Sequence, residues 1–374
     1  MRIAYLTNIP GPYRAAMIEA WATRLARDGI TLSVSYTDEG DQGRGWAAPP
    51  AAGISETRLP TILRIPGYGR LNRGLLDLVR RNDVVMIGGF EQASYLAAAV
   101  AARLAGRRVI LLFDGFGPKR MTTDPILVHL VKKFTAKLCN AYFANGSVGR
   151  SFLVDHLGVD PGRVFNQYLC TPTGDLERER ASATSRMERR RALGLPTERP
   201  IAVVCGYLIE RKQPETIVDA VAGLAAERRP LLLFVGRGPL QDAVAERARR
   251  LGVDAVFAGF RQGRELAAHY LASDFLILSS RDDPWGLVVN EAMAAGLPVV
   301  CSDACGARLD LVEDGVTGFG FRAGDAGDLG RAIGDLLGSD MVAMGDAARH
   351  RIAEWTPERS AESLAACVRS LGPV

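Results

Sequence analysis

The chain has 374 residues, of which 48% are hydrophobic and 24% are charged. This balance is typical of a soluble globular protein, and the length predicts two domains at roughly 150 residues per domain. The longest apolar runs, such as residues 95–102, are far shorter than the ~20 residues of a membrane-spanning helix, which excludes that class of protein.

The net charge of +4 is unevenly distributed along the chain. Residues 1–170 hold 21 Lys and Arg against 13 Asp and Glu, a net charge of +8, and residues 171–374 hold 25 against 29, a net charge of −4. This asymmetry suggests that the two halves face different partners, although chance scatter of surface charge is an equal alternative. We expect no nucleic-acid partner for the basic half.

The six cysteines form no CxxC pair and show no metal-ligand spacing with the four histidines. We interpret them as buried, reduced thiols. The chain also opens directly with a strand-like segment in place of a leader pattern. We therefore expect a cytoplasmic protein.

Short apolar runs alternate with longer amphipathic segments along the whole chain. In the first half the predicted strands are residues 2–9, 31–36, 84–88, 108–113 and 141–144. In the second half they are residues 201–205, 231–235, 255–258, 275–279 and 298–301. Continuously apolar runs are typical of parallel strands buried on both faces, with helical patterns such as residues 13–28, 214–227 and 240–251 between them. The sequence thus predicts an α/β protein with two doubly wound domains.

The boundary between the two series is predicted in the charged segment 174–200, interpreted as a connection with a solvated helix. The domains are expected over residues 1–172 and 173–354. A further helix is predicted over residues 356–371, where Pro357 lies in the first turn.

One amphipathic segment in the last third of the first half has two open interpretations. Its apolar residues at helical spacing are Leu127, Leu130, Val131, Phe134 and Leu138, and the lysines predicted on the other side are Lys132, Lys133 and Lys137. With Lys119 and Arg120, the segment 119–138 could contact an anionic membrane as a peripheral helix. The alternative is an ordinary helix packed on its own domain.

Two common nucleotide-binding motifs do not occur. GxGxxG is absent, since GRGPLQ at Gly236 has a proline where the helix should open, and GxxxxGK[ST] is also absent. A Rossmann dehydrogenase and a P-loop phosphotransferase are therefore disfavoured.

The stretch SSRDDPWGLVVNEAMAAGLPVV follows a predicted buried strand and carries the acids Asp283 and Glu291 on either side of Pro284-Trp285-Gly286. It lies at the carboxyl end of that strand, where open α/β sheets bind ligands, and Gly286 near the helix start leaves backbone N–H groups for an anion. No histidine lies nearby and the two acids are eight residues apart, so we expect no metal site. The alternative is a surface acid followed by a solvated helix residue.

This stretch, continued as CSDACGARLDLVEDGVTGF, resembles the nucleotide-sugar site of the family 4 retaining glycosyltransferases. Three further stretches match in order, namely GYLIERKQPETIVDAV, LLFVGRGPL and AGFRQGRELAAHYLASDFLILSS. The resemblance is specific over about residues 200–322. It implies a GT-B architecture, with two Rossmann-like domains facing across a cleft. It also implies that the last helix, residues 355–374, packs back on the first domain.

The resemblance assigns roles in binding a UDP- or GDP-sugar donor, with no cofactor and no metal. Arg211 and Lys212 would bind the diphosphate and stabilise its departure. Asp283 would accept hydrogen bonds from the transferred sugar, and Glu291 from the ribose hydroxyls. The remaining donor-site residues would be Gly206, the amides of Gly286, Leu287 and Val288, and the nucleobase segment Gly259, Phe260 and Arg261.

Two positions depart from the family pattern. The family motif is E-x7-E, whereas this chain has D-x7-E with the shorter Asp283, a change that could alter donor choice. Tyr207 stands where many members have an arginine, which removes one phosphate contact.

In the first domain the resemblance is only general. Asp114 stands where many members place a histidine and would contact the donor sugar or the acceptor hydroxyl, with a turn aspartate as the alternative. Gly11 could bring backbone close to a phosphate and Arg14 could bind an anionic acceptor, but an ordinary tight turn explains this loop equally.

The implied function is transfer of a sugar to an acceptor hydroxyl with retention of configuration. The acceptor would be a glycan or lipid-linked glycan in cell-surface polysaccharide assembly, which would place the protein at the inner face of the membrane. Two alternatives stay open: an epimerase or hydrolase of the same fold, and a catalytically silent nucleotide-sugar-binding protein.

Overall fold

The computed structural model describes residues 1–38, 51–120 and 124–372. The chain divides into two compact units. The first unit comprises residues 1–115, 121–171 and 355–374, and the second comprises residues 116–120 and 172–354. The assignment of residues 116–120 to the second unit was not anticipated from the sequence.

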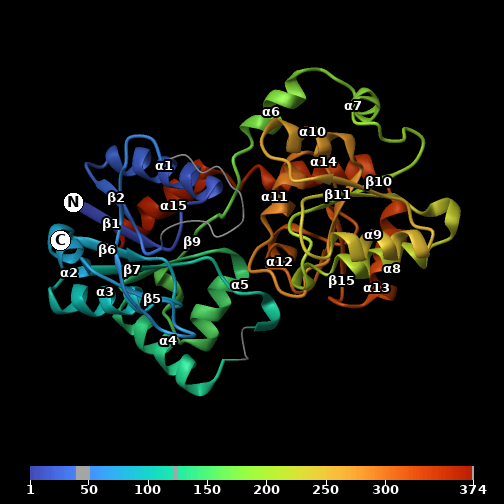
Figure 1. Ribbon diagram of the computed structural model, residues 1–374. Coiled ribbons are helices and arrows are strands. Elements are labelled where there is room, and N and C mark those ends of the chain that lie inside the picture. The colour runs from blue at the N-terminus through green and yellow to red at the C-terminus, as the bar shows by residue number, and fades with distance from the viewer. Residues whose placement is uncertain (39–50, 121–123, 373–374) are drawn as a thin grey trace. The chain divides into compact units, whose positions relative to one another are not determined.

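The first unit is built on a parallel sheet. Within the described residues the sheet has seven strands in the order β3-β2-β1-β6-β7-β8-β9 (Figure 1). The strands are β1 (Arg2–Thr7), β2 (Thr31–Tyr36), β3 (Ser55–Arg58), β6 (Val84–Ile87), β7 (Arg108–Phe113), β8 (Ala141–Ala144) and β9 (Val164–Asn166). The central strands are buried along nearly their whole length, as their continuous apolar runs predict. An antiparallel pair, β4 (Thr61–Arg64) and β5 (Arg70–Asn72), lies outside this sheet.

The helices of the first unit include the last helix of the chain. They are α1 (Pro12–Ala26), α2 (Leu75–Arg81), α3 (Ala93–Leu104), α4 (Ile126–Leu138), α5 (Gly146–Ser151) and α15 (Pro357–Arg369). Helix α15 packs against α1 (Figure 1). The buried Trp21 Nε1 donates to Ser360 Oγ at 2.9 Å, and Arg24 Nε donates to Glu362 Oε1 at 2.6 Å. These contacts join residues more than 300 positions apart to one core.

The second unit has a sheet of the same kind. Its described residues form six parallel strands in the order β12-β11-β10-β13-β14-β15. The strands are β10 (Ile201–Cys205), β11 (Leu231–Val235), β12 (Ala255–Gly259), β13 (Phe275–Leu278), β14 (Val299–Ser302) and β15 (Gly318–Phe321). The helices are α6 (Gly174–Ala181), α7 (Arg186–Ala192), α8 (Pro214–Ala222), α9 (Gln241–Arg250), α10 (Arg264–Ala272), α11 (Leu287–Ala294), α12 (Ala307–Leu311), α13 (Ala326–Leu337) and α14 (Met341–Ile352). The prediction of two parallel-sheet α/β domains is confirmed.

The strand order determines where ligands can bind. In both sheets the chain builds outward from a central strand and then returns to its other side, so the order reverses between β1 and β6 and between β10 and β13. Open α/β sheets bind ligands outside the carboxyl ends of the strands at this point of reversal. In the second unit these ends are residues 206–213 after β10 and 279–286 after β13.

The charged segment 174–200 belongs to the second unit, where more than half of its residues are exposed. Its helices α6 and α7 both pack against α10. Arg190 is buried, where it donates to Ala272 O at 2.8 Å and pairs with Asp274. The high charge density predicted the exposure of residues 181–188, whereas Arg190 is satisfied inside the fold by carbonyl and carboxylate oxygens.

The apolar spacing of helix α4 suggests that its leucines and Phe134 are buried, but the helix buries the opposite face. The side chains of Leu127, Leu130 and Phe134 are exposed by 70%, 54% and 52%, whereas Lys132 is only 9% exposed. Lys132 is paired with Asp124 and lies 5.5 Å from the centre of the Phe152 ring. No helix in the described ranges is long and apolar enough to cross a membrane.

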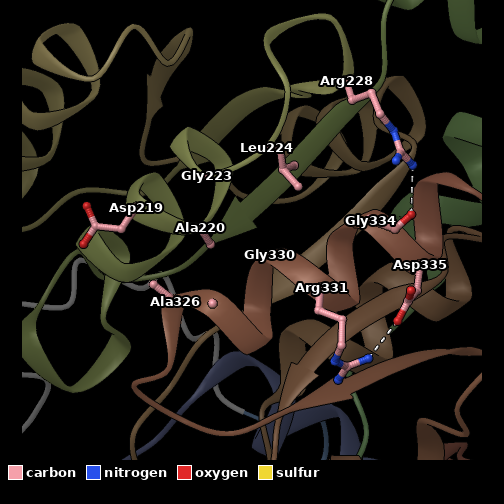
Figure 2. A pocket seen from close by; sticks show the side chains of 11 residues that line it. Asp219, Ala220, Gly223, Leu224, Arg228, Ala326, Gly330, Arg331, Gly334 and Asp335 are labelled. Atoms are coloured by element: carbon pink, nitrogen blue, oxygen red, sulfur yellow. Dashed lines mark hydrogen bonds and ion pairs between the residues drawn. The ribbon is translucent and has the colours of Figure 1, made fainter.

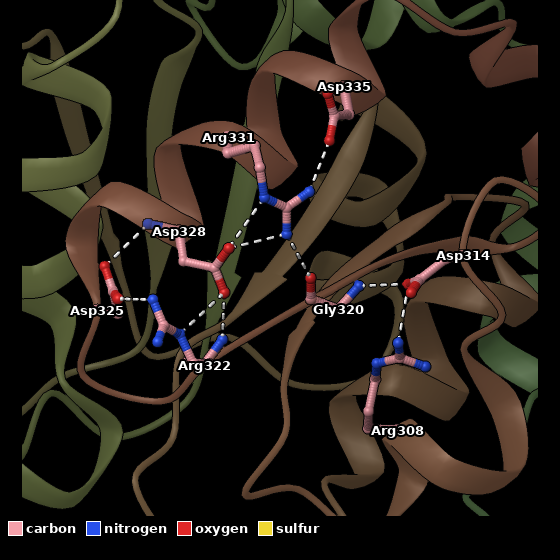
Figure 3. A network of polar contacts seen from close by, with 8 residues as sticks. All are labelled: Arg308, Asp314, Gly320, Arg322, Asp325, Asp328, Arg331 and Asp335. Atoms are coloured by element: carbon pink, nitrogen blue, oxygen red, sulfur yellow. Dashed lines mark hydrogen bonds and ion pairs between the residues drawn. The ribbon is translucent and has the colours of Figure 1, made fainter.

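A polar network links the start of α13 to the strand β15 (Figure 3). Asp328 accepts from the Arg322 backbone N at 2.7 Å and from Arg331 Nε at 2.9 Å. Asp325 caps α13 by accepting from the Asp328 N–H at 2.9 Å. The Arg322 N–H, followed by Arg331, lowers the pKa of Asp328, so this carboxylate contributes to the stability of the second unit.

Candidate functional site

The loops that follow β10 and β13 bring two predicted site residues into direct contact. Lys212 Nζ donates to Asp283 Oδ2 at 2.5 Å, and Arg211 Nη1 lies 4.0 Å from the same oxygen. Arg211 also donates to the carbonyl of Asp282. Asp283 is buried and Lys212 is largely so. Two cations therefore converge on one carboxylate where this sheet is expected to bind ligands.

The backbone of Asp283 is held on both sides. Its N–H donates to Ala304 O at 3.0 Å, and its carbonyl accepts from Gly306 N at 3.1 Å. Ser280 Oγ donates to Asp283 Oδ2 at 3.3 Å. These contacts fix the carboxylate between the loop after β13 and the loop after β14, so Lys212 meets an acid with a defined position.

The turn between the two acids is also tightly packed. Gly286 has φ +89°, and an added Cβ would lie 2.7 Å from both Cys305 Sγ and Leu278 Cδ2. Glycine avoids both the backbone strain and the clash. The buried Trp285 donates from Nε1 to Asn290 Oδ1 at 2.8 Å, which ties the turn to α11.

Helix α11 begins at Leu287, with Gly286 at its N-cap position. The N–H groups of Leu287 and Val288 belong to its first turn, where an α-helix has no acceptor of its own for them. This helix end supplies the donors that the sequence predicted for an anion.

Glu291 lies one turn further along α11, beside a residue that the sequence analysis did not identify. Tyr270 OH donates to Glu291 Oε2 at 2.7 Å, and burial raises the pKa of Glu291 to about 7. Tyr270 comes from α10 and is buried. It precedes Glu291 by 21 residues, so no local spacing signals the pair. The one signal in the sequence is that Tyr270 lies shortly before the buried strand β13, whose carboxyl end leads into the site.

The remaining predicted donor residues follow the neighbouring strands. Gly206 follows β10 with φ +129°, and its backbone is so close to Gly236 that a Cβ on Gly236 would overlap it. Gly259 ends β12 with φ +72°. Arg261 Nη1 donates to Phe260 O at 3.0 Å. All of these positions lie at the carboxyl ends of adjacent strands, along one edge of the second sheet.

The candidates in the first unit form their own cluster. Arg14 Nη2 donates to Asp114 Oδ2 at 2.6 Å, and Gln167 Nε2 donates to Asp114 Oδ1 at 3.1 Å. Arg14 is buried and also donates to Tyr5 OH at 2.5 Å. Asp114 and Arg14, predicted separately, are thus one ion pair. Gly11 is extended, with φ −149°, and caps α1, so its backbone is not in a tight glycine-requiring turn.

A groove of about 490 Å³ in the second unit is not part of either cluster (Figure 2). It lies along helices α8 and α13 and is lined by small residues such as Gly223 and Gly330. Its charged residues already have partners, since Arg228 donates to Gly334 O at 3.2 Å and Arg331 to Asp335 at 2.7 Å. None of the predicted site residues lines it.

Comparison with known proteins places this fold and sequence in one group. The family model described as "Glycosyl transferases group 1" matches residues 185–356. A D-inositol 3-phosphate glycosyltransferase of Nocardia farcinica is 30% identical over 79% of this chain and 67% of its own length. A GDP-mannose-dependent alpha-(1-6)-phosphatidylinositol monomannoside mannosyltransferase of Mycolicibacterium smegmatis is 29% identical over 80% of this chain and 79% of its own.

For two other D-inositol 3-phosphate glycosyltransferases, from Corynebacterium kroppenstedtii and Catenulispora acidiphila, the match spans only about half of their length, 51% and 49%. Among solved structures, HepE of Anabaena, crystallised with UDP, has a TM-score of 0.73 and 19% identity, with 99% of this chain and 100% of that chain covered. The two parallel-sheet α/β domains are those of the GT-B glycosyltransferases. By sequence and by fold, the chain belongs to the group 1 glycosyl transferases.

Proposed function

We propose that this protein is a retaining, family 4 glycosyltransferase that moves a hexose from a nucleotide-diphosphate sugar to an acceptor hydroxyl. The observation that carries the proposal is the Lys212–Asp283 contact, with Arg211 beside it, at the strand ends of the second sheet. The mannosyltransferase of Mycolicibacterium smegmatis is named for a GDP-mannose donor, and HepE was crystallised with UDP. Both are compatible with a donor that carries a diphosphate.

The chemistry of such a donor fits the residue types at this edge. Cleavage of the bond between the anomeric carbon and the phosphate oxygen places negative charge on the leaving diphosphate. Arg211 and Lys212 would stabilise that charge, as would the N–H groups of Leu287 and Val288 in the first turn of α11. Asp283 would accept hydrogen bonds from the sugar, and Glu291 from the ribose.

Retention needs no protein nucleophile in this proposal. The acceptor oxygen forms the new bond to the anomeric carbon on the face from which the diphosphate leaves. Its proton passes to the leaving phosphate oxygen, so charge and atoms balance between the two substrates. In the first unit, Asp114 and its partner Arg14 are the proposed contacts for the donor sugar or the acceptor.

A panel of UDP- and GDP-sugars, assayed with and without candidate acceptors, tests the proposal. We expect Lys212→Ala and Glu291→Ala to lower acceptor-dependent turnover by roughly 100-fold or more. Arg250→Ala, which removes an exposed cation of α9, serves as the matched control. Donor conversion without acceptor would favour an epimerase or hydrolase, and binding without turnover would favour a silent binding protein. Normal turnover in both site variants would refute the assignment.

We also propose that the acceptor is lipid-linked and that the protein contacts an anionic membrane through α4. The support is the exposed apolar face of Leu127, Leu130 and Phe134 described above, to which the exposed Ile126 also belongs. Lys133 and Lys137 are exposed beside it, and neither has an ion pair within the described residues. An apolar stripe flanked by unpaired lysines is the pattern of a helix lying in a lipid interface. Lys119 does not belong to this surface, since it pairs with Asp303 of the second unit at 2.7 Å.

Vesicle co-sedimentation tests this second proposal. Leu127→Ser/Phe134→Ser should weaken binding to phosphatidylglycerol-containing vesicles at least tenfold, because each buried apolar side chain contributes about 1.5–3 kcal/mol. Lys133→Gln/Lys137→Gln should remove the preference over pure phosphatidylcholine, at about 1 kcal/mol per lysine. Leu309→Ser, an exposed leucine of α12, is the control. Vesicle binding that is the same in the parent and in both α4 variants would contradict a membrane surface. The proposal would also be contradicted if the parent did not bind vesicles and Leu127→Ser/Phe134→Ser only lost self-association.

A further inference from the structure

The buried pair of Tyr270 and Glu291 has a consequence for how a donor is held. Glu291 projects from α11 and Tyr270 from α10, so two separate elements meet at the carboxylate. The hydroxyl donates to Oε2 at 2.7 Å. Among the described residues, Tyr270 is the hydrogen-bond partner of this carboxylate, and Oε1 has none.

The hydroxyl is a dependable donor. Burial, together with the nearby Cys205 and Glu291, raises the pKa of Tyr270 well above its usual range, so the hydroxyl keeps its proton at every accessible pH. Cys205, at the end of β10, is also protonated, because burial raises the pKa of its thiol to about 12. These two neutral groups are the titratable groups that face Glu291 from α10 and from β10. In the part of the chain that the structure describes, no ion pair compensates the burial of Glu291, so a neutral donor supports its ionised form.

We propose that Tyr270 is a positioning residue for the nucleotide donor: its hydroxyl holds Glu291 Oε2 and leaves Oε1 to accept a hydrogen bond from a ribose hydroxyl. This inference rests on the proposed role of Glu291 in binding the donor. The inference adds that the affinity for the nucleotide depends on the Tyr270 hydroxyl, although this hydroxyl does not contact the nucleotide. Because only the ionised carboxylate accepts at both oxygens, nucleotide binding should strengthen as pH rises through about 7, where Glu291 titrates.

The test is titration of the full chain with UDP and with GDP between about pH 5.5 and 8.5. Tyr270→Phe removes only the hydroxyl, so we expect the midpoint of the pH dependence to move up by roughly one unit, with affinity at neutral pH reduced several-fold. Tyr142→Phe is the matched control, since it removes a buried hydroxyl that donates to Ala136 O at 2.7 Å in the first unit. Glu291→Gln should abolish the protein's contribution to the pH dependence and leave that of the nucleotide phosphates.

The outcomes distinguish a failure of the proposed donor site from a failure of the role proposed for Tyr270. If Glu291→Ala leaves UDP and GDP binding unchanged, the proposed donor site is wrong. If Glu291→Ala weakens binding but Tyr270→Phe leaves both the affinity and the pH midpoint as in the parent, the Tyr270 inference is overturned. Should Tyr270→Phe fail to fold, the parent protein still decides. Binding of UDP or GDP to the parent protein must release a proton near pH 7, and binding to the Glu291→Gln variant must not release that proton. Equal proton release by the two proteins would overturn the inference.

Discussion

Lys212 and Asp283 are 71 residues apart in the chain and 2.5 Å apart in the second unit. Lys212 follows β10 and Asp283 follows β13, two strands that are adjacent in the sheet. The carboxylate compensates the charge of the lysine, and under the proposed function an incoming diphosphate would compete for that lysine. This pair therefore links the charge that would bind phosphate to the acid that would bind sugar.

Asp283→Asn is expected to separate binding from turnover. Without the carboxylate, Lys212 and Arg211 remain free to contact a diphosphate, so affinity for UDP or GDP should be unchanged or higher. Turnover of the sugar nucleotide should fall by roughly 100-fold, because the sugar loses a charged acceptor. Calorimetry for the nucleotide and product formation for turnover measure the two effects. Weaker nucleotide binding in Asp283→Asn would show that the acid, and not the lysine alone, organises the phosphate site.

Glu291→Gln should change how stability depends on pH. The pKa of Glu291 is about 7 in the folded protein, against 4.5 as its ordinary value, so the folded state holds this proton more tightly than the unfolded state. Stability is therefore expected to fall as pH rises from about 4.5 to 7, by up to about 3 kcal/mol. The neutral glutamine removes this loss. Denaturation of parent and variant at several pH values measures it, and Glu265→Gln, an exposed acid of α10, should retain the parental slope.

Gly286→Ala is expected to destabilise the second unit strongly. The substitution adds backbone strain of about 1–2 kcal/mol at a positive φ and a clash of about 1–3 kcal/mol with Cys305 and Leu278. Gly315→Ala separates the two effects, because Gly315 has φ +74° and a Cβ added there would meet no atom within 4 Å. Calorimetric unfolding should show the larger loss for Gly286→Ala. Equal losses would mean that the turn tolerates the added methyl group.

Asp328→Asn should lower stability at neutral pH by about 1–2 kcal/mol, because it weakens hydrogen bonds from Arg322 and Arg331 to a charged acceptor. The pKa of Asp328 is lowered in the folded protein, so its contribution is present above the unfolded value of about 3.9 and is lost as pH falls. Parent and variant should therefore converge toward pH 3. Asp335→Asn, which affects a single contact with Arg331, is the milder comparison. A difference that persists at low pH would point to packing instead of charge.

The sequence predicted the central strands closely because those strands are apolar throughout. The bounds of β10 and β11 coincide with the predicted runs, since both strands are covered on both faces. The strands β3 and β15 were missed for the opposite reason: β3 is the exposed sequence SETR, and β15 is the glycine-alternating GFGF. Short edge strands are defined by their neighbours more than by their own composition.

The orientation of α4 shows a second feature that could not be predicted from the sequence, namely which face of a helix is buried. Helical spacing indicates that one face is apolar, but the buried face is decided by what lies beneath it. Here Thr135, Ala136 and the paired Lys132 face inward, and the large apolar residues remain outside. A buried lysine becomes possible because Asp124 compensates its charge, and no pattern in the helix itself shows that partner.

The candidate site was predictable as a set of residues but not as a set of pairs. Arg211, Lys212, Asp283 and Glu291 were identified through a family pattern. The contacts of Lys212 with Asp283 and of Tyr270 with Glu291 depend on the strand order and on how α10 packs, which no local spacing encodes.

The anchoring of α15 on α1 bears on how the protein is made. The hydroxyl of Ser360 accepts from Trp21 and donates to the carbonyl of Gln167, so the core of the first unit includes side chains that are translated after the whole second unit. The second unit, by contrast, is complete by residue 354. During vectorial synthesis the order of completion is therefore inverted. The unit whose strands emerge first must wait, with part of α1 uncovered, until the unit encoded after it has already been translated.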